Sequence, residues 1–593
     1  PEDARARSCC GGHRRAMTGK RAIKEFDRRF VRRLLTVAVL FGLGGMAVLA
    51  RAVQLQLLDQ EFLARQGDAR HLRVASIAAH RGMITDRHGE PLAVSTPVDS
   101  LWANPAELVA ATDRLPELAD ALGWTRDRLV QLVTRNSGRE FVYLIRHMPP
   151  HKAAEILSLD VPGVYSRREY RRYYPVGEVA GHVVGFTDLD DRGLEGLELA
   201  FDPWLTGKSG AKRVMRDRLG QTIADVENIS APRPGRDLRT SLDLRLQYLA
   251  YRALKRGVGQ HRARAGSVVI IDVDSGEVLA MANQPGFNPN DRRRFEVSQF
   301  RNQAATDIFE PGSIFKPFIV AAALESGRYR PDSVLDTSPG YLIVGAKTIE
   351  DKHNLGRIPI TTVLTKSSNV GASRIALSLE PEQLWSVLDR FGIGQLTSSG
   401  FPGESAGLLT HADHWREIGQ ATLAYGYGLS VTTLQLAQAF AVLGADGVAR
   451  PVSLVAVEEG AEESERVISP DTARAVVEMM ETVVSPQGTA RKAAVPGYRI
   501  AGKTGTARKA TAGGYSESLY TSVFGGLAPA SRPRLAVVVV VHEPSAGHYY
   551  GGEVAAPVFS EIVSGALRVL GIPPDQTDGP GPERPAIQAI RQP

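Results

Sequence analysis

Residues 310–320 read EPGSIFKPFIV, in which a serine is followed three positions later by a lysine. A proline-glycine pair interrupts the preceding structure, and the apolar residues after Lys316 favour a helix. Pro317 suits the start of that helix, because N–H groups of the first turn have no partner and proline has no N–H. The pattern therefore predicts Ser313 at a helix N-terminus, with Lys316 one turn away on the same face.

These residues alone leave two interpretations open. In the first, Ser313 is a nucleophile, and the positive end of the helix dipole favours its alkoxide and a neighbouring oxyanion. Lys316 would accept the serine proton, which requires burial or a nearby cation to lower its pKa well below about 10.4. In the second, Ser313 is a helix cap and Lys316 is a solvated surface lysine.

Two further motifs lie downstream, at spacings of 54 and 136 residues. TKSSNVG, in an apolar helical context, supplies Ser367, Ser368 and Asn369. GKTGTA supplies Lys503, Thr504, Gly505 and Thr506. The order S-x-x-K, S-x-N, K-T-G within one domain is typical of serine acyl-transferases that recognise penicillin. The ordered set favours the nucleophile interpretation of Ser313.

A competing pattern overlaps the third motif. GYRIAGKT at residues 497–504 matches the phosphate-binding loop G-x-x-x-x-G-K-[ST]. Such a loop needs a strand before it and a helix after it, so that helix N–H groups bind phosphate. Here Tyr498, Arg499 and Ile500 have the character of a strand, and the following GTARKATAGG is a poor helix. A P-loop NTPase that uses residues 497–504 is the least favoured alternative.

Positive charge is concentrated at the N-terminus. Residues 1–33 hold eleven Lys/Arg against four Asp/Glu, whereas the other 560 residues carry 60 basic and 61 acidic side chains. The basic character therefore does not indicate nucleic-acid binding. From Leu34 to Ala50 seventeen residues carry no charge, which is just long enough to span a bilayer. The arginines before this run predict a cytoplasmic N-terminus and an exported remainder.

A cleaved signal peptide is the alternative for this segment, but no clear small-x-small site follows the apolar run. Both cysteines, Cys9 and Cys10, precede it, which excludes disulfides, a cysteine nucleophile and a thiolate metal site from the exported part. His542 and His548 lack the spacing of a zinc site, and neither a metal nor a cofactor is expected. Met17 could be the true start, which would make residues 1–16 dispensable.

The exported part divides into two regions. Residues 55–235 alternate short strand-like runs with helical stretches, and APRPGRDL at 232–239 is interpreted as a linker. Residues 236–572 open with a hairpin, GSVVIIDV and EVLAMAN, and close with the strands SVFGGLA and RLAVVVVVHE around long helical patterns. This arrangement predicts an α+β domain whose sheet is closed by its own termini. Residues 573–593 hold six prolines and are expected to be disordered.

With these motifs the chain resembles the class B penicillin-binding proteins, specifically the division-type (FtsI-type) peptidoglycan D,D-transpeptidases of Gram-negative bacteria. RGMITDRHGEPLAVS, RRYYPVGEVAGHVVGFT and GLEGLELAFD resemble the non-catalytic pedestal of that family, and FEPGSIFKP, KSSNVG and AGKTGTARK resemble its transpeptidase core. The resemblance implies an antiparallel sheet with helices on both faces. The expected parts are a cytoplasmic tail (1–33), a transmembrane helix (34–54), a dimerisation-type pedestal (55–235), a periplasmic transpeptidase domain (236–572) and a tail (573–593).

The resemblance also implies a role for each motif residue. Ser313 would attack the penultimate D-Ala carbonyl of a stem pentapeptide, and Lys316 would be the general base. Ser367 would relay the proton to the leaving amine, while Asn369 would orient Lys316 and bind the substrate amide. The substrate carboxylate would meet the K-T-G segment Lys503, Thr504, Gly505 and Thr506. The backbone N–H groups of Ser313 and Thr506 would form the oxyanion hole.

The same resemblance implies partners and alternatives. β-Lactams would acylate Ser313, and an amine from a second stem peptide would complete the cross-link. No glycosyltransferase signature precedes the pedestal, so a separate membrane glycan polymerase of the FtsW type is expected as partner, together with other division proteins. Asn369 is typical of division enzymes, whereas elongation-type relatives, the leading alternative, usually carry Asp there. A membrane-anchored β-lactam sensor would need a cytoplasmic signalling part larger than 33 residues.

Overall fold

The computed structural model describes residues 19–58, 60, 72–216, 222–293, 295–457, 464–511 and 513–576. Cys9, Cys10 and Met17 lie outside these residues, as do the first part of the basic tail and most of the tail that was expected to be disordered, from residue 577 onward. The chain forms two compact units. One comprises residues 1–77 and 211–231, and the other comprises residues 78–210 and 232–593.

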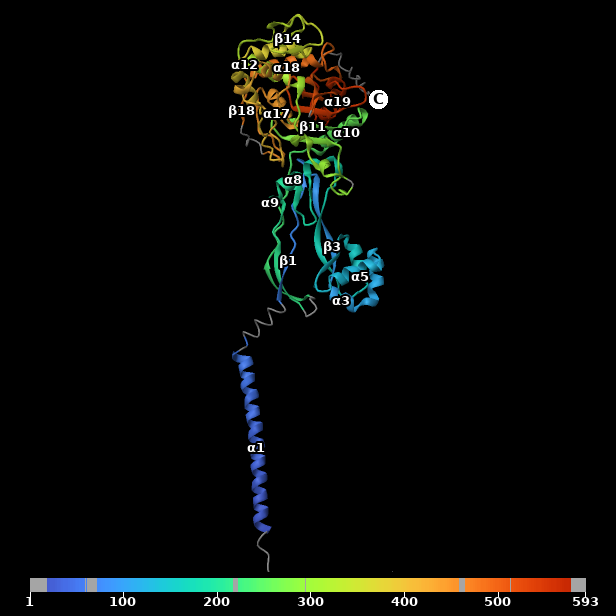
Figure 1. The fold of residues 1–593 in the computed structure, drawn as a ribbon, viewed down its shortest axis with the longest axis vertical. Coiled ribbons are helices and arrows are strands. Elements are labelled where there is room, and N and C mark those ends of the chain that lie inside the picture. Colours follow the sequence, from blue (N-terminus) through green and yellow to red (C-terminus); the bar gives the residue numbers. More distant parts are fainter. Residues whose placement is uncertain are drawn as a thin grey trace, which may run out of the picture. The chain divides into compact units, whose positions relative to one another are not determined.

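The first unit contains the apolar helix. α1 (Gly19–Val53) continues into a π-helical turn, η1 (Gln54–Leu58), and so begins before the predicted segment of residues 34–54 (Figure 1). Phe30–Leu57 has the length and hydropathy of a membrane span, and none of that span is buried. An unburied apolar helix of this length suits contact with lipid. The strands β1 (Leu72–Ile77), β8 (Gly210–Arg216) and β9 (Thr222–Ser230) form a sheet in the order β1-β8-β9.

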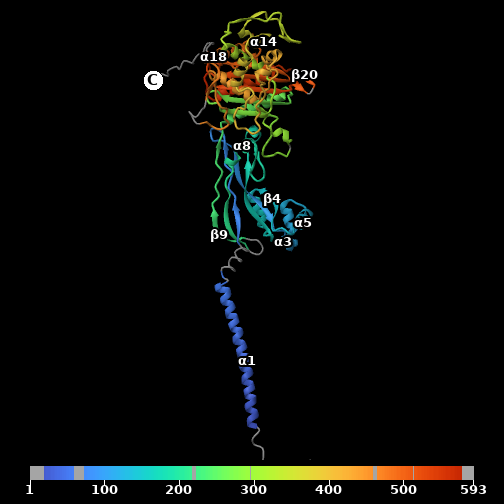
Figure 2. The same cartoon turned by 60° about the vertical axis from the view of Figure 1, so that its left-hand side comes forward.

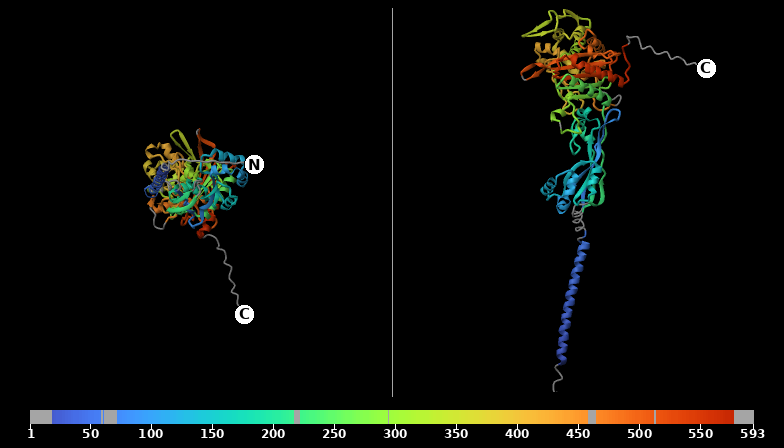
Figure 3. Two further views of the ribbon diagram at one scale, coloured as in Figure 1. Left: turned by 90° about the horizontal axis from the view of Figure 1, so that it is seen from below. Right: turned by 90° about the vertical axis from the view of Figure 1, so that its right-hand side faces the viewer.

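In the second unit, a pedestal sheet is built on one long strand. Its strands are β2 (Ile84–Thr85), β3 (Pro91–Ala103), β4 (Val142–Met148), β5 (Val164–Tyr173) and β10 (Leu238–Arg239), and β5 pairs with β3 over ten residues. Four helices cover one end of β3: α3 (Pro105–Ala110), α4 (Leu115–Leu122), α5 (Arg126–Arg135) and α6 (Pro150–Leu157) (Figures 2 and 3). Leu101 on β3 is fully buried among their apolar side chains, including Leu108 and Leu118.

The predicted linker at residues 232–239 is instead packed into the pedestal. Leu238 and Arg239 form β10, which pairs in parallel with β2. A Cβ on Gly82 would lie 2.0 Å from the carbonyl oxygen of Arg236, so the two backbones are in direct contact. The proline-rich composition suggested a free segment, but its N–H groups donate to the backbone of several neighbours: Arg233 to Lys208, Gly235 to His80 and Arg236 to Trp204.

A buried ion network joins the three pedestal segments quoted above. Arg81 Nε lies 2.6 Å from Glu198 Oε2, and Arg172 Nε lies 2.6 Å from Glu198 Oε1. Arg81 also contacts Asp202 at 2.7 Å. The side chains of both arginines and of Glu198 are at most 1% exposed. Each charge is therefore stabilised by its ion-pair partners and not by water.

Removing the carboxylate of Glu198 should therefore destabilise the pedestal. We expect Glu198→Ala to lower the free energy of unfolding by about 3–5 kcal/mol, because it removes the carboxylate that the buried guanidinium groups of Arg172 and Arg81 share and leaves Arg81 paired with Asp202 alone. Urea unfolding of the full chain in detergent measures this. Glu227→Ala, which breaks an exposed pair with Arg213, should cost less than about 1 kcal/mol. Equal effects of the two variants would contradict the assigned role of Glu198.

The transpeptidase-like region contains the predicted antiparallel sheet, in the order β12-β11-β21-β20-β19. Its strands are β11 (Ala265–Asp272), β12 (Val278–Gln284), β19 (Ala501–Thr511), β20 (Gly514–Ala528) and β21 (Leu535–His542). The expected hairpin pairs residues 266–271 with 278–284, and the two late strands pair with each other beside it. The predicted fold class is confirmed.

Helices cover both faces of this sheet. Gly525 faces Phe440 of α17 (Thr433–Gly444), whereas the next residue, Gly526, faces Phe559 of α19 (Gly551–Val569). Successive strand residues point to opposite faces, so α17 and α19 lie on opposite sides. α10 (Leu244–Gln260) packs beside α19, where Gly257 accommodates Val558.

The remaining elements are short connections or lie around the sheet. The other α-helices are α7 (Gly181–Val184), α8 (Gly196–Ala200), α9 (Asp202–Leu205), α11 (Gln303–Thr306), α12 (Lys316–Glu325), α13 (Ile360–Thr365), α14 (Asn369–Leu377), α15 (Pro381–Arg390), α16 (Glu417–Leu423) and α18 (Pro470–Val484). The 3-10 turns are η2 (Thr112–Arg114), η3 (Gly177–Val179), η4 (Val297–Phe300), η5 (Gly312–Phe315), η6 (Ala412–His414) and η7 (Arg491–Ala493). The short strands are β6 (Phe186–Thr187), β7 (Gly193–Glu195), β13 (Val334–Asp336), β14 (Tyr341–Val344), β15 (Lys347–Glu350), β16 (Arg357–Pro359), β17 (Val448–Ala449) and β18 (Glu465–Arg466).

The prediction that Tyr498, Arg499 and Ile500 form a strand is wrong. Tyr498 closes a turn through a bridge with Val495, Arg499 and Ile500 follow it without regular secondary structure, and β19 begins only at Ala501. Tyr498 suggested a strand because aromatic residues favour strands, but its hydroxyl instead donates to the carbonyl of Ile572. The K-T-G residues therefore lie on the strand itself. Because no helix follows them, the segment has no phosphate-binding helix terminus, and the P-loop alternative is not favoured.

Candidate active site

Ser313 lies in the 3-10 turn η5, which leads directly into α12. The predicted helix start is confirmed, with the difference that its first turn is 3-10, and Pro317 occupies the first turn of α12 as expected. No side chain forms a capping hydrogen bond at either start. Ser313 is therefore not used as a helix cap, and its hydroxyl is available to other groups.

Glycines allow the turn to lie against its neighbours. Gly312 has φ of +65°, and its N–H donates to the carbonyl of Gly426 at 3.0 Å. A Cβ on Gly505 would lie 2.7 Å from the carbonyl oxygen of Pro311. The glycine of the K-T-G motif thus lets β19 approach the backbone beside Ser313, which a larger residue would prevent.

Lys316 is fully buried and points at the other motif residues. Its Nζ lies 3.0 Å from Ser313 Oγ and 2.8 Å from Asn369 Oδ1. It also contacts the backbone oxygen of Ser367 at 2.6 Å and the Ser367 hydroxyl at 3.2 Å. Burial, reinforced by the nearby charge of Lys503, holds the pKa of Lys316 well below its usual value. A solvated lysine is excluded, and the amine is suited to accept a proton.

Lys503 is a second buried lysine, and it contacts the same Ser367 hydroxyl as Lys316 does. Its Nζ lies 3.0 Å from Ser367 Oγ and 3.1 Å from the carbonyl oxygen of Thr504. Burial lowers the pKa of Lys503 to about 7. Ser367, with φ of +60°, therefore places one hydroxyl between two lysines. A continuous hydrogen-bonded path runs from Ser313 through Lys316 and Ser367 to Lys503.

The two threonines of the K-T-G segment anchor the wall of the site. The Thr504 hydroxyl lies 3.0 Å from that of Thr489, and the Thr506 hydroxyl accepts the N–H of Gly551 at 2.9 Å. Gly551 begins α19, and a Cβ there would lie 2.3 Å from the carbonyl oxygen of Gly505. The start of α19 thus packs directly on the motif.

Asp351 was not predicted from the sequence, yet it holds the S-x-N motif in place. Its carboxylate accepts the hydroxyl of Ser368 at 2.5 Å and the backbone N–H groups of Asn369 and Val370 at 2.5 and 3.1 Å. A carboxylate at the N-terminus of α14 also interacts favourably with the helix dipole. Asp351 lies in the IEDKHN loop, and no local pattern links that loop to the motif.

The motif residues open into a cleft of about 460 Å³. Ser313, Ser367, Asn369, Thr504 and Thr506 all line it, while Lys316 and Lys503 lie beneath, fully buried. All the residues predicted for the site are therefore gathered in one place.

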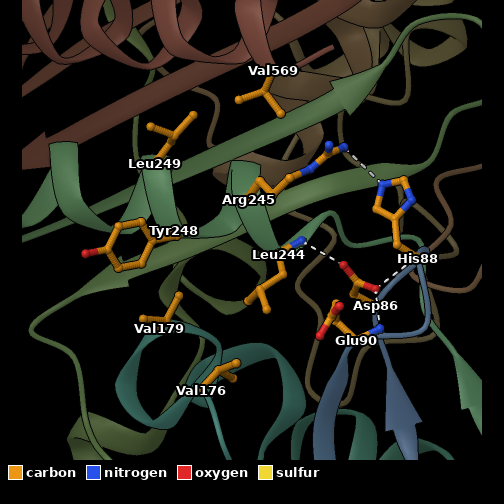
Figure 4. A pocket seen from close by; sticks show the side chains of 10 residues that line it. All are labelled: Asp86, His88, Glu90, Val176, Val179, Leu244, Arg245, Tyr248, Leu249 and Val569. Atoms are coloured by element: carbon orange, nitrogen blue, oxygen red, sulfur yellow. Dashed lines mark hydrogen bonds between the residues drawn. The ribbon is translucent and has the colours of Figure 1, made fainter.

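A larger cavity of about 840 Å³ lies at the junction of the pedestal and the sheet region (Figure 4). The apolar side chains around it come from α10, α19 and the segment around η3, and Arg245 points toward His88 at one end. No motif residue lines this cavity. The 460 Å³ cleft is therefore the candidate active site.

Comparison with known proteins agrees with this geometry. Residues 266–564 match the penicillin-binding protein transpeptidase domain, and residues 76–240 match the penicillin-binding protein dimerisation domain. The chain belongs to the penicillin-binding protein family. It is 44% identical to the peptidoglycan D,D-transpeptidase FtsI of Escherichia coli over 89% of this chain and 90% of the relative. The class B, FtsI-type assignment is thereby confirmed.

Other relatives support the same family. A probable peptidoglycan D,D-transpeptidase, PbpC, of Pseudomonas aeruginosa is 43% identical over 92% of this chain and 96% of the relative. Among solved structures, penicillin-binding protein 3 of Mycobacterium tuberculosis, complexed with aztreonam, has a TM-score of 0.65 and 30% identity, and the match covers 85% of this chain and 98% of that chain. The transpeptidase domain of Burkholderia pseudomallei penicillin-binding protein 3 has a TM-score of 0.53 and 43% identity, covering 57% of this chain and 98% of that one.

In a penicillin-binding protein with this site, Asp351 should act as a positioning residue. We expect Asp351→Ala to slow acylation by benzylpenicillin about tenfold, because the N–H groups of Asn369 and Val370 lose the carboxylate that holds Asn369 beside Lys316. Stopped-flow measurement of the acylation rate tests this. Glu350→Ala, which alters the exposed neighbour, serves as the control and should leave the rate unchanged. An unaltered rate in Asp351→Ala would contradict the role.

Proposed function

We propose that this protein is a peptidoglycan D,D-transpeptidase that cross-links stem peptides in septal wall synthesis through a serine acyl-enzyme, and that β-lactams acylate it. One observation carries the proposal: the buried amine of Lys316, with its lowered pKa, lies 3.0 Å from the hydroxyl of Ser313. The names of its relatives, FtsI above all, support a division role over the elongation-type alternative. The asparagine at position 369 is in keeping with this.

In the proposed acylation, neutral Lys316 accepts the proton of Ser313 as Oγ attacks the carbonyl of the penultimate D-Ala. The backbone N–H groups of Ser313 and Thr506 donate to the developing oxyanion. As the C–N bond breaks, the proton passes from Lys316 through the Ser367 hydroxyl to the leaving amine. The products are free D-Ala and an ester on Ser313.

The second half of the reaction returns the enzyme to its starting state. An amine of an acceptor stem peptide attacks the ester and loses its proton to Lys316, and Ser313 Oγ leaves and is reprotonated. Throughout, we assign the substrate carboxylate to Lys503 and to the hydroxyls of Thr504 and Thr506. Asn369 holds Lys316 and binds the substrate amide, which orients the donor for attack.

The family and the apolar helix point to a single-pass protein of the inner membrane. We further propose a cytoplasmic N-terminus and a periplasmic transpeptidase domain, because basic residues cluster before Leu34. We also propose a membrane glycan polymerase of the FtsW type as partner, together with other division proteins. Such a partner would supply the glycan strands whose stem peptides are joined.

The experiment that tests the function supplies the purified full chain with a stem pentapeptide donor and an amine acceptor. We expect release of D-Ala and a cross-linked product whose mass equals donor plus acceptor minus D-Ala, and both should vanish after treatment with aztreonam. Absence of acyl-enzyme with both the pentapeptide and benzylpenicillin would contradict the proposal.

Lys503 gives the reaction a pH dependence. Because burial lowers its pKa to about 7, its ammonium is lost as the pH rises through neutrality. If the protonated form meets the substrate carboxylate, the rate of acylation by benzylpenicillin should fall above about pH 7, approaching tenfold per pH unit. Lys503→Arg keeps its charge at these pH values, so its profile should stay level even where its rate is lower. A level profile in the unaltered protein would contradict the assignment.

A further inference from the structure

Two exposed lysines, Lys352 and Lys366, line the cleft, and neither forms an ion pair among the residues that the structure describes. Glu553, which also lines the cleft, is paired with Lys492. Both oxygens of the Asp351 carboxylate accept hydrogen bonds from the start of α14. The two ammonium groups are therefore available to an acidic ligand.

The two lysines differ in where their ammonium groups lie. Lys366 donates to the backbone oxygen of Gln487 at 2.7 Å. Lys352 Nζ instead lies 5.5 Å from the centroid of the Tyr550 ring, which belongs to the residue immediately before α19. Since Asp351 ties the adjacent loop to the S-x-N motif, Lys352 reaches across the cleft from that loop to the wall formed by β19 and α19.

The proposed reaction determines which part of the substrate passes this lysine. The terminal carboxylate is assigned to Thr504 and Thr506, and the scissile carbonyl to the N–H groups of Ser313 and Thr506. Since Thr504 is assigned to the carboxylate end and Thr506 to the carbonyl before it, this order along β19 directs the donor peptide upstream of these atoms toward Arg508.

Three tyrosines lie in a row beside this end of β19, of which Tyr550 lines the cleft. Tyr520 on β20 pairs with Arg508 on β19, and the Tyr549 ring stacks on Tyr520 with centroids 4.1 Å apart. Tyr549 in turn lies 4.5 Å from the ring of Tyr550, over which Lys352 is placed. The upstream stem therefore leaves the cleft along these rings and beside Lys352.

We propose that Lys352 binds a carboxylate of the donor stem peptide upstream of its terminal D-Ala pair, so that it selects an acidic donor. This inference rests on the proposed transpeptidase function. A free carboxylate on the stem offers an ammonium group a stronger partner than an aromatic ring does. The ring holds the lysine in place until the donor arrives, which limits the entropy lost on binding.

The test uses the full chain and two pentapeptide donors that differ only in whether the carboxylates upstream of the D-Ala pair are free or amidated. We expect Lys352→Ala to lower kcat/KM for D-Ala release from the free-acid donor about tenfold and to leave the amidated donor within about twofold. Lys352→Glu should prefer the amidated donor. Lys347→Ala, which removes an exposed lysine from β15 outside the cleft lining, should change neither value.

A second measurement uses two β-lactams whose acyl side chains carry either a carboxylate or its amide, since that side chain takes the place of the upstream stem. Lys352→Ala should slow acylation by the carboxylate compound about tenfold and leave acylation by the amide compound within about twofold. Equal losses for acid and amide would show that Lys352 only shapes the cleft, and no loss for either would show that it does not touch the donor. Both results would overturn the inference. Failure of the unaltered protein to react with any β-lactam would instead overturn the proposed function.

Discussion

Ser313→Ala is expected to eliminate covalent labelling by fluorescent penicillin, because the proposed nucleophile is the only group that forms the acyl bond. The substitution removes one oxygen from a 3-10 turn in which Ser313 caps nothing, so the fold should be retained. Ser367→Ala should give an intermediate result, with labelling slowed about a hundredfold, because the hydroxyl between the two lysines is lost while the nucleophile remains. Gel fluorescence over a time course measures both.

The control for this prediction is Ser326→Ala, at the opposite end of α12, where the hydroxyl donates to the carbonyl of Ala323 and accepts the N–H of Arg328. It should label at the unaltered rate. Labelling of Ser313→Ala at the rate of the unaltered protein would show that another residue is the nucleophile.

Lys316→Ala is expected to slow acylation by benzylpenicillin at least a thousandfold, the range that general base catalysis supplies. The cause is the loss of the amine that lies 3.0 Å from Ser313 Oγ. Lys316→Arg should be equally slow, because a guanidinium group cannot be deprotonated in a protein and so cannot act as base. Single-turnover kinetics with benzylpenicillin provide the rate.

Thermal unfolding separates this catalytic effect from damage to the fold. Lys316 is fully buried, so Lys316→Ala leaves a cavity and removes the donor to Asn369 Oδ1 and the Ser367 carbonyl. Its melting temperature should therefore fall, but the variant should still unfold in one cooperative transition well above the temperature of the assay. A Lys316→Ala variant that acylates within tenfold of the unaltered rate would show that Lys316 is not the base.

The sequence was sufficient where the determining pattern is local. A run of apolar residues with its flanking charges predicts a membrane-spanning helix, and α1 contains it. Likewise, the alternation and turn residues of residues 265–284 predict a hairpin, which β11 and β12 form. The motif residues were found together because their order and types are characteristic, although 136 residues separate Ser367 from Lys503.

The sequence was insufficient where contacts between distant segments decide the structure. Asp351 has no local signature, and only its position beside α14 reveals its role. Tyr498 has a residue type favoured in strands, yet its hydroxyl is engaged by Ile572, so tertiary packing overrides the local preference. The buried network around Glu198 joins three segments whose charged residues would be expected at the surface on composition alone.

Mass spectrometry of the intact adduct, followed by peptide mapping, identifies the acylated residue. The full chain is treated with benzylpenicillin, digested and sequenced by fragmentation. We expect an added mass equal to one penicillin molecule, on the peptide containing residues 310–316 and specifically on Ser313. An adduct on any other residue, or no adduct at all, would contradict the proposed role of Ser313.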